Sequence, residues 1–148
     1  MDFILGGRRD AGARRLGETN MRILLSALFE IDLAYLRAHL GTPRIYRAGV
    51  RYRVEPVGRE HWRDVPTVLA SGEGDCEDLA CWRAAELCVR DGVAAVPAYT
   101  WRREPGYRVY HVVVRLPGGG VEDPSARLGM GRGAGGRMSP IPIRGGGE

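Results

Sequence analysis

The sequence predicts an α+β fold, because two helical patterns precede a group of short strands. The helical patterns occupy residues 21–40 and 75–92, and both place apolar residues three and four positions apart. Two β-rich runs then flank a Pro-Gly turn at 105–106, which is the pattern of an antiparallel hairpin. A chain of 148 residues is long enough to bury the core of one such domain.

The domain is expected to occupy residues 20–130, between two polar ends. Residues 1–19 are rich in Gly and Arg and are predicted to form a flexible arm. Residues 131–148 show no periodicity and are predicted to be a Gly/Arg-rich tail. Half of the 22 glycines lie after residue 117, so the composition itself changes near this boundary.

Composition and charge argue against two classes of partner. All 22 basic residues are arginine, yet the net charge is only +4 and no block of like charge occurs, so a nucleic-acid partner is not favoured. No run approaches the roughly 18 apolar residues of a membrane span, and the N-terminus lacks the apolar region of a secretory signal. We therefore expect a cytoplasmic protein with no membrane partner.

The first helix is expected to begin after Asn20 as its N-cap and to end before Gly41 and Pro43. Its apolar stripe is wide, so the helix needs a surface to pack on. The residues predicted to form the stripe are Leu24, Leu28, Ile31 and Tyr35, with Leu25, Phe29, Leu36 and Leu40 beside them.

The segment that follows is expected to contain short elements. Residues 45–56 alternate apolar residues with arginine, which indicates a strand or an extended segment. A short helix is expected over 62–69, with Pro66 in its first turn, and residues 71–74 (SGEG) are predicted to be a turn.

The second helix has clear start and stop signals. Acidic residues occupy positions 75, 77 and 78, where the helix dipole favours negative charge, and Gly92 is expected to end the helix. Its buried stripe is predicted to contain Ala80, Ala84, Leu87 and Cys88, whose small alanines allow close packing on the sheet. Trp82 is expected to cover the rim of the helix. The three cysteines have no metal-binding spacing and are expected to be reduced.

After the hairpin, Gly118–Gly120 are predicted to turn the chain into a short strand, Val121–Asp123. With this turn, position 115 is expected to lie opposite position 123. Asp123 is then placed near the end of the strand, so twist or a bulge is needed to bring it to His111.

Cys76 is the first candidate for chemistry, because it lies where the second helix begins. Unpaired N–H groups and the dipole at a helix start stabilise a thiolate, whereas the acids at 75 and 77 oppose this effect. Taken alone, a cysteine here is equally consistent with a small residue filling the helix start.

His111 and Asp123 give Cys76 a possible function. His111 lies within the apolar strand VYHVVV, where a buried ring needs a hydrogen-bond partner, and Asp123 follows in the next strand. A thiolate can attack a carbonyl carbon, the imidazole can move the proton, and the carboxylate can orient the ring. The Cys76 N–H and the Trp62 side chain are candidate oxyanion donors, and Asp75 is expected to cap the helix and help to hold the Cys76 loop.

The motifs GDCEDLA, then HVVV, then VEDPS, in this order, resemble the transglutaminase-like superfamily over residues 43–130. They are most similar to its small, standalone bacterial and bacteriophage members. The resemblance implies a papain-like core in which Cys76 is the nucleophile, His111 the base and Asp123 the orienting acid. It implies no cofactor, because the chain has no recognisable calcium loop.

The expected function is that of a cysteine hydrolase, a peptidase or amidase that acts on a peptide or isopeptide amide through a thioester. An acyltransferase of the same kind would share the first half-reaction. If a phage encodes the chain, the location is the host cytoplasm or the virion.

Three alternatives stay open. The first is a phage structural or assembly protein that keeps the fold with little or no catalysis and binds partners through its terminal arms. The second is a metal site built from Cys76, His111, Asp123 and Glu77, although nothing in their spacing favours one, so no metal is expected. The third is nucleic-acid binding by the arginines together with Trp101, Tyr107 and Tyr110.

Overall fold

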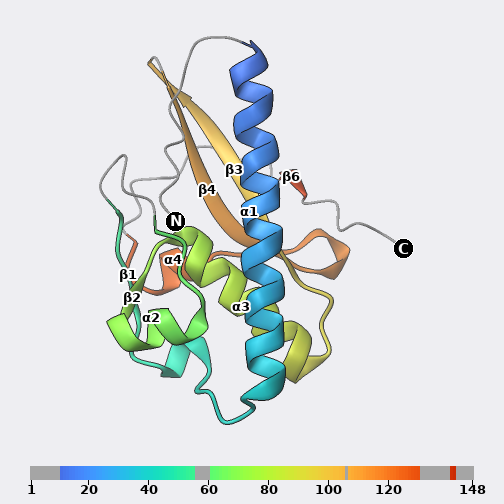
Figure 1. The fold of residues 1–148 in the computed structure, drawn as a ribbon, viewed down its shortest axis with the longest axis vertical. Coiled ribbons are helices and arrows are strands. Elements are labelled where there is room, and N and C mark those ends of the chain that lie inside the picture. The colour runs from blue at the N-terminus through green and yellow to red at the C-terminus, as the bar shows by residue number, and fades with distance from the viewer. Residues whose placement is uncertain (1–10, 56–60, 106, 131–140, 143–148) are drawn as a thin grey trace.

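The computed structural model describes residues 11–55, 61–105, 107–130 and 141–142, and its architecture is α+β, as predicted (Figure 1). The two long helices, α1 (Ala11–Ala38) and α3 (Cys76–Asp91), pack against each other. Helix α3 also packs on an antiparallel sheet with the strand order β5-β4-β3-β6. The core therefore lies on both sides of α3.

The sheet is centred on the two longest strands, β3 and β4, and the elements other than these strands and the two long helices are shorter. Apart from α1 and α3, the elements are η1 (Ile45–Arg47), β1 (Arg51–Tyr52), α2 (Val65–Ser71), β2 (Glu73–Gly74), β3 (Val96–Glu104), β4 (Tyr107–Arg115), η2 (Pro117–Gly119), β5 (Val121–Glu122), α4 (Pro124–Arg127) and β6 (Ile141–Pro142).

Helix α1 is longer than the sequence predicts. It begins at Ala11, so Asn20 lies inside the helix and the prediction of an N-cap there is wrong. Ala, Arg, Leu and Glu between positions 11 and 18 are good helix formers, and they outweigh the two glycines among them and the asparagine at position 20. Residues 11–19 of the predicted arm are thus helical, and residues 1–10 lie outside the described residues.

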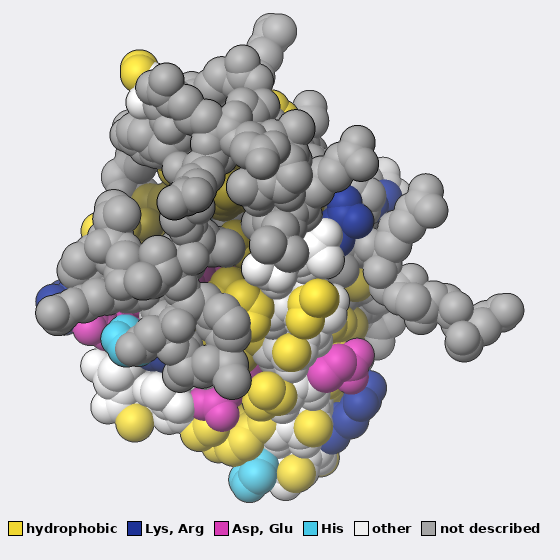
Figure 2. Space-filling model, turned by 45° about the horizontal axis from the view of Figure 1, so that its top comes forward, with side chains coloured by type: hydrophobic (Ala, Val, Ile, Leu, Met, Phe, Trp, Pro, Cys, Tyr) yellow, Lys and Arg dark blue, Asp and Glu magenta, His cyan; other side chains and the backbone are white. Residues whose placement is uncertain are grey.

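The buried side of α1 is rotated relative to the predicted stripe. Ile31 is 51% exposed, whereas its neighbour Asp32 is fully buried. Asp32 Oδ1 accepts a hydrogen bond of 2.9 Å from the Val65 N–H, which ties α1 to the first turn of α2. Exposed hydrophobic side chains such as Ile23 remain on α1, and Figure 2 shows hydrophobic side chains scattered among polar ones on this face.

The segment before α3 brings β1 against the start of that helix. Helix α2 ends at Gly72, whose φ of 73° suits glycine, and residues 73–74 then form β2 instead of completing the predicted turn. Strand β2 pairs in parallel with β1, which places Tyr52 opposite Gly74. A Cβ on Gly74 would lie 3.2 Å from Asp78 Cβ, so glycine permits this close approach. Of the extended segment predicted over 45–56, only 51–52 form a strand.

Helix α3 follows its sequence signals closely. It begins after Asp75 as the N-cap and ends at Gly92, which is left-handed with a φ of 63°. The predicted stripe is buried, except that Cys88 is half-buried. Trp82 is also completely buried, so its prediction as a rim residue is wrong. The reason is a second apolar cluster on the far side of α3, made by Leu36, Ile45 and Val65 among others.

The sheet contains the predicted hairpin. Strands β3 and β4 pair from Val96↔Arg115 to Glu104↔Tyr107, which leaves a two-residue turn at the Pro-Gly position. Strand β5 pairs with the far end of β4, through Val114↔Glu122 and Arg115↔Val121. The predicted tail also contributes a short strand, because β6 pairs with β3 at Ala98 and Tyr99.

Candidate active site

The start of α3 is fixed by a reciprocal pair of caps. Asp75 Oδ1 accepts a hydrogen bond of 2.6 Å from the Cys76 N–H, and Asp78 Oδ2 accepts one of 3.1 Å from the Asp75 N–H. Glu55 donates its N–H to Asp75 Oδ2 at 3.4 Å, which holds the chain after β1 against the same turn. Cys76 is therefore the first residue of α3 in a tightly defined position.

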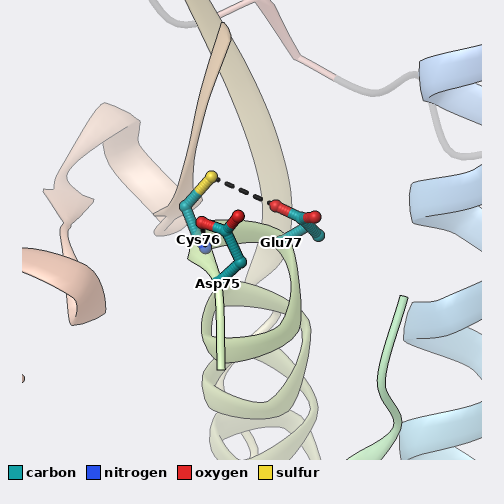
Figure 3. A group of neighbouring side chains, drawn as sticks. All are labelled: Asp75, Cys76 and Glu77. Carbon is teal, nitrogen blue, oxygen red and sulfur yellow. Dashed lines mark hydrogen bonds between the residues drawn. The ribbon is translucent and has the colours of Figure 1, made fainter. Parts of the chain in front are cut away.

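The Cys76 sulfur has two neighbours that matter for its chemistry. Its S–H donates to Glu77 Oε2 at 3.2 Å, and Figure 3 shows these two groups facing each other at the start of α3. From β4, the backbone N–H of Val112 favours the thiolate and acts to lower the pKa of the thiol. Only 9% of Cys76 is exposed, so the group that the sulfur attacks must fit closely against the helix start.

Cys76 is held as a neutral thiol in this arrangement. Burial raises the pKa of the thiol well above its usual value, and the negative charges of Glu77 and Asp75 raise it further. The Val112 N–H acts in the opposite direction without reversing the shift. The sequence indicates that the helix start favours a thiolate and that the neighbouring acids oppose it. In the structure, the acids together with burial outweigh the helix start.

The acids at the start of α3 are themselves buried. Desolvation raises the pKa of Asp78 to about 7, even though Arg63 lies beside it and donates its N–H to Oδ1 at 2.8 Å. Burial likewise raises the pKa of Glu77 well above its usual value, with the charges of Asp75 and Asp78 adding to the effect. We refer to Asp75, Glu77 and Asp78 as the acid cluster.

His111 and Asp123 are in direct contact. His111 Nε2 lies 2.8 Å from Asp123 Oδ2, and His111 is only 7% exposed. Burial of Asp123 opposes its ionisation, but the bonds from His111 and from the Ala126 N–H outweigh burial, and the pKa of this carboxyl is lowered. The contact uses Nε2, so Nδ1 is the ring nitrogen that can take a proton from a thiol.

The register of β5 explains why this contact forms. Arg115 lies opposite Val121 and not opposite Asp123, so the predicted pairing is wrong. The turn over η2 is tighter than expected, which shifts β5 by two residues along β4. Extending the pairing by one residue places Asp123 beside Val113, on the same face as His111 and one step along. Neither a bulge nor extra twist is needed.

Cys76 and the His111–Asp123 pair both lie near the middle of β4. Val112, whose backbone N–H acts on the pKa of the Cys76 thiol, is the residue next to His111. Among the described residues, the thiol donates to Glu77 and no hydrogen bond links it to His111. The three residues expected from the sequence thus lie around one short stretch of β4, with the thiol engaged by a neighbouring acid.

Tyr52 is a residue of this site that the sequence interpretation missed. Its position opposite Gly74 packs it against the cluster that contains Cys76. Burial raises the pKa of its hydroxyl, and the charges that raise it further belong to Asp75, Cys76, Glu77 and Asp123. The phenol thus lies among the groups of the site. No local pattern marks it, because the parallel pairing of β1 with β2 joins segments about 20 residues apart.

The two residues expected to support the site have different positions. Asp75 caps α3, as expected, but its carboxylate occupies the Cys76 N–H, so the prediction that this N–H is free for an oxyanion is wrong for this arrangement. Trp62 packs against the cluster that contains Cys76, and its buried Nε1 has no hydrogen-bond partner among the described residues. An indole N–H of this kind remains available as a donor.

A set of possible cation ligands exists at the same place. Asp75, Cys76 and Glu77 each offer one ligand atom, and these atoms lie within 4.8 Å of one another. They differ from the set considered from the sequence, in which His111 and Asp123 take part. The carboxylate of Asp75 already accepts two backbone N–H groups and the thiol already donates to Glu77, so we assign these side chains to the architecture of the helix start.

Comparison with family models, curated proteins and solved structures gave no match. Within the described part of the chain, no helix combines the length and the apolar character needed to cross a membrane. The geometry of the site is therefore the basis on which a function can be inferred.

Proposed function

We propose that the protein is a cysteine hydrolase of the peptidase or amidase type, with Cys76 as nucleophile, His111 as base and Asp123 as orienting acid. The observation that carries the proposal is the 2.8 Å contact between His111 Nε2 and Asp123 Oδ2. His111 is adjacent in β4 to Val112, whose backbone N–H acts to lower the pKa of the Cys76 thiol. This arrangement offers a thiol, an oriented imidazole and a buried setting in one place.

The reaction begins with transfer of the thiol proton from Sγ to His111 Nδ1, and the new imidazolium is stabilised by Asp123. The thiolate adds to the carbonyl carbon of the amide, and the C–N bond then breaks as the imidazolium returns the proton to the leaving amine. The product of this half-reaction is a thioester on Cys76. Water, deprotonated by His111, attacks the thioester and releases the acid, which restores the thiol. An amine in place of water would give acyl transfer.

The oxyanion needs hydrogen-bond donors close to the sulfur. The Val112 N–H acts on the thiol, and the Tyr52 and Trp62 side chains pack against the same cluster. Within the described residues, the hydrogen bond that Tyr52 forms outside the β1–β2 pairing is that of its backbone N–H to Leu128 O, so its hydroxyl can act as a donor. We assign these three groups as the donors, in place of the Cys76 N–H.

The test is acylation of Cys76 by p-nitrophenyl acetate, followed by mass spectrometry of the intact protein and its peptides. We expect one acetyl group on Cys76, added faster than to a model thiol and lost again with time as the thioester hydrolyses. Cys76→Ala should remove this adduct, and Cys81, which is fully buried, is the internal control. Acetylation no faster than that of a model thiol would leave an assembly protein with an inactive site as the better description.

A further inference from the structure

Glu77 has an unusual position for a buried acid. It is 7% exposed, and its only side-chain partner among the described residues is the Cys76 thiol, at 3.2 Å. Its neighbour Asp78 is also buried but accepts an N–H from Arg63 and another from Asp75. No arginine is paired with Glu77 within the described residues, so the thiol is what satisfies this carboxylate.

We propose that Glu77 is a positioning residue that holds Cys76 in its protonated resting form, by accepting the S–H bond that must break before His111 can take the proton. The proposal deepens the proposed function and rests on it. Activation then requires the thiol to rotate from Glu77 Oε2 toward Nδ1 of His111. The proton moves from Sγ to Nδ1, and the protonation state of Glu77 does not change in this step.

The charges that face the thiol determine the sign of the effect. At the start of its own helix these are Asp75 and Glu77, and Asp78 acts on Glu77. From β1, the Tyr52 phenol interacts with the charge of Cys76. From the sheet, the Val112 N–H acts on the thiol, and the adjacent His111 is paired with Asp123. A negative carboxylate beside a thiol favours the neutral form. Burial and the Glu77 charge both raise the pKa of the Cys76 thiol, so neutralising Glu77 removes one of the two main causes.

The experiment is the rate of iodoacetamide alkylation of Cys76 against pH, measured by peptide mass spectrometry in wild type and in Glu77→Gln. Glutamine keeps the size and the acceptor oxygen but removes the charge. We expect the pH midpoint to fall by about one unit, which corresponds to about tenfold more thiolate near neutral pH. The matched control is Glu73→Gln, which removes an acid from β2 that pairs with Arg53 instead of the thiol.

An unchanged midpoint, or slower alkylation in Glu77→Gln, would overturn the proposal, because the carboxylate would then be either without influence or itself the base. Alkylation needs no oxyanion and no substrate amide, so this result is independent of whether p-nitrophenyl acetate acylates Cys76. The proposed function and this inference can therefore fail separately.

A second measurement on the wild-type protein covers the case in which Glu77→Gln does not fold. The S–H stretching band of Cys76, isolated as the Raman difference between wild type and Cys76→Ser, should lie below that of a thiol without a partner, because the S–H donates to a carboxylate. A band at the position of a free thiol would contradict the contact, whatever the variant does.

Discussion

Two groups of acids lie along α3, and they are balanced in different ways. At the start of the helix, the acid cluster of Asp75, Glu77 and Asp78 has one arginine nearby, Arg63, and the pKa values of its carboxyls are raised, by burial first. Two turns later, Arg83 bonds to both Glu86 and Glu122, at 2.6 and 2.8 Å.

The second group consists of hydrogen bonds and ring contacts that hold separate segments together. Glu86 also accepts the Ile45 N–H, Tyr46 donates to Glu122, and the Tyr46 ring lies between Arg83 and Arg127. Although burial opposes it, the bonds from Arg83 and Tyr46 keep the pKa of Glu122 low. In the second group, each buried acid is paired with an arginine and stabilises the fold. In the acid cluster, Glu77 has no arginine partner within the described residues, and its charge raises the pKa of the Cys76 thiol.

The largest effect should come from replacing His111, the proposed base. His111→Ala is expected to lower the rate of Cys76 acylation by p-nitrophenyl acetate by about 10²–10⁴-fold, because it removes the imidazole that is proposed to take the thiol proton. The control is His39→Ala, which removes an exposed ring stacked on Tyr35. A loss of less than tenfold in His111→Ala would remove His111 from the proposed mechanism.

The next effect should appear at the arginine network. Arg83→Met leaves Glu86, which is 1% exposed, as a buried charge without its partner, and should lower the free energy of unfolding by about 3 kcal/mol. Urea denaturation measures this change. Arg44→Met, which breaks an exposed pair with Asp91, should cost far less. If Arg83→Met also moved the alkylation midpoint of Cys76, the two groups would not be independent.

A smaller effect is expected at Asp32, which, like Glu77, has no cation partner within the described residues. Burial raises the pKa of Asp32 from 3.8 to about 8, and its Oδ2 has no partner within the described residues. Because the folded value exceeds the unfolded one, the contribution of Asp32 to stability is complete below about pH 4 and is lost as pH rises through about 8.

Asp32→Asn removes this titration and keeps an acceptor for the Val65 N–H. The variant should be more stable than wild type at about pH 8, by about 1–3 kcal/mol. The stability of wild type should fall between about pH 5 and pH 8, and the stability of the variant should change much less over the same range. Thermal unfolding at the two pH values measures both quantities. An unchanged pH dependence would mean that other carboxyls, such as Asp78, dominate it.

The smallest effect should come from Tyr52. Tyr52→Phe is expected to slow acylation of Cys76 by about tenfold, the value of one hydrogen bond to the oxyanion, and to leave alkylation by iodoacetamide unchanged, since alkylation forms no oxyanion. The ratio of the two rates is the readout. An equal change in both rates would assign Tyr52 to packing of the site.

Local signals account for most of what the sequence predicts correctly. The bounds of α3 follow from Asp75 and Gly92, and the hairpin follows from two β-rich runs around a Pro-Gly turn. The proximity of His111 and Asp123 follows from their adjacent strands, although the detailed register depends on how tightly the chain turns at η2.

What the sequence does not predict depends on contacts between distant segments. Trp82 is buried because η1 and α2 cover the far side of α3, and Tyr52 reaches the site because β1 pairs with β2. The S–H bond to Glu77 depends on a side-chain rotamer, which no periodicity encodes. Asp32 shows the same limit, because its burial depends on one backbone N–H in α2.

Asp123 has two roles, as the partner of His111 and as the N-cap of α4, and shortening its side chain to Ala would remove both. One oxygen of its carboxylate meets His111 and the other accepts the Ala126 N–H that begins α4, while Leu128, just after α4, accepts the backbone N–H of Tyr52. A protein engineer who moves His111 and Asp123 into another scaffold must therefore move α4 with them, because the same carboxylate caps that helix. Replacing Asp123 with Ala would remove the N-cap of α4 together with the partner of His111, whereas Asp123→Asn keeps an oxygen for the cap.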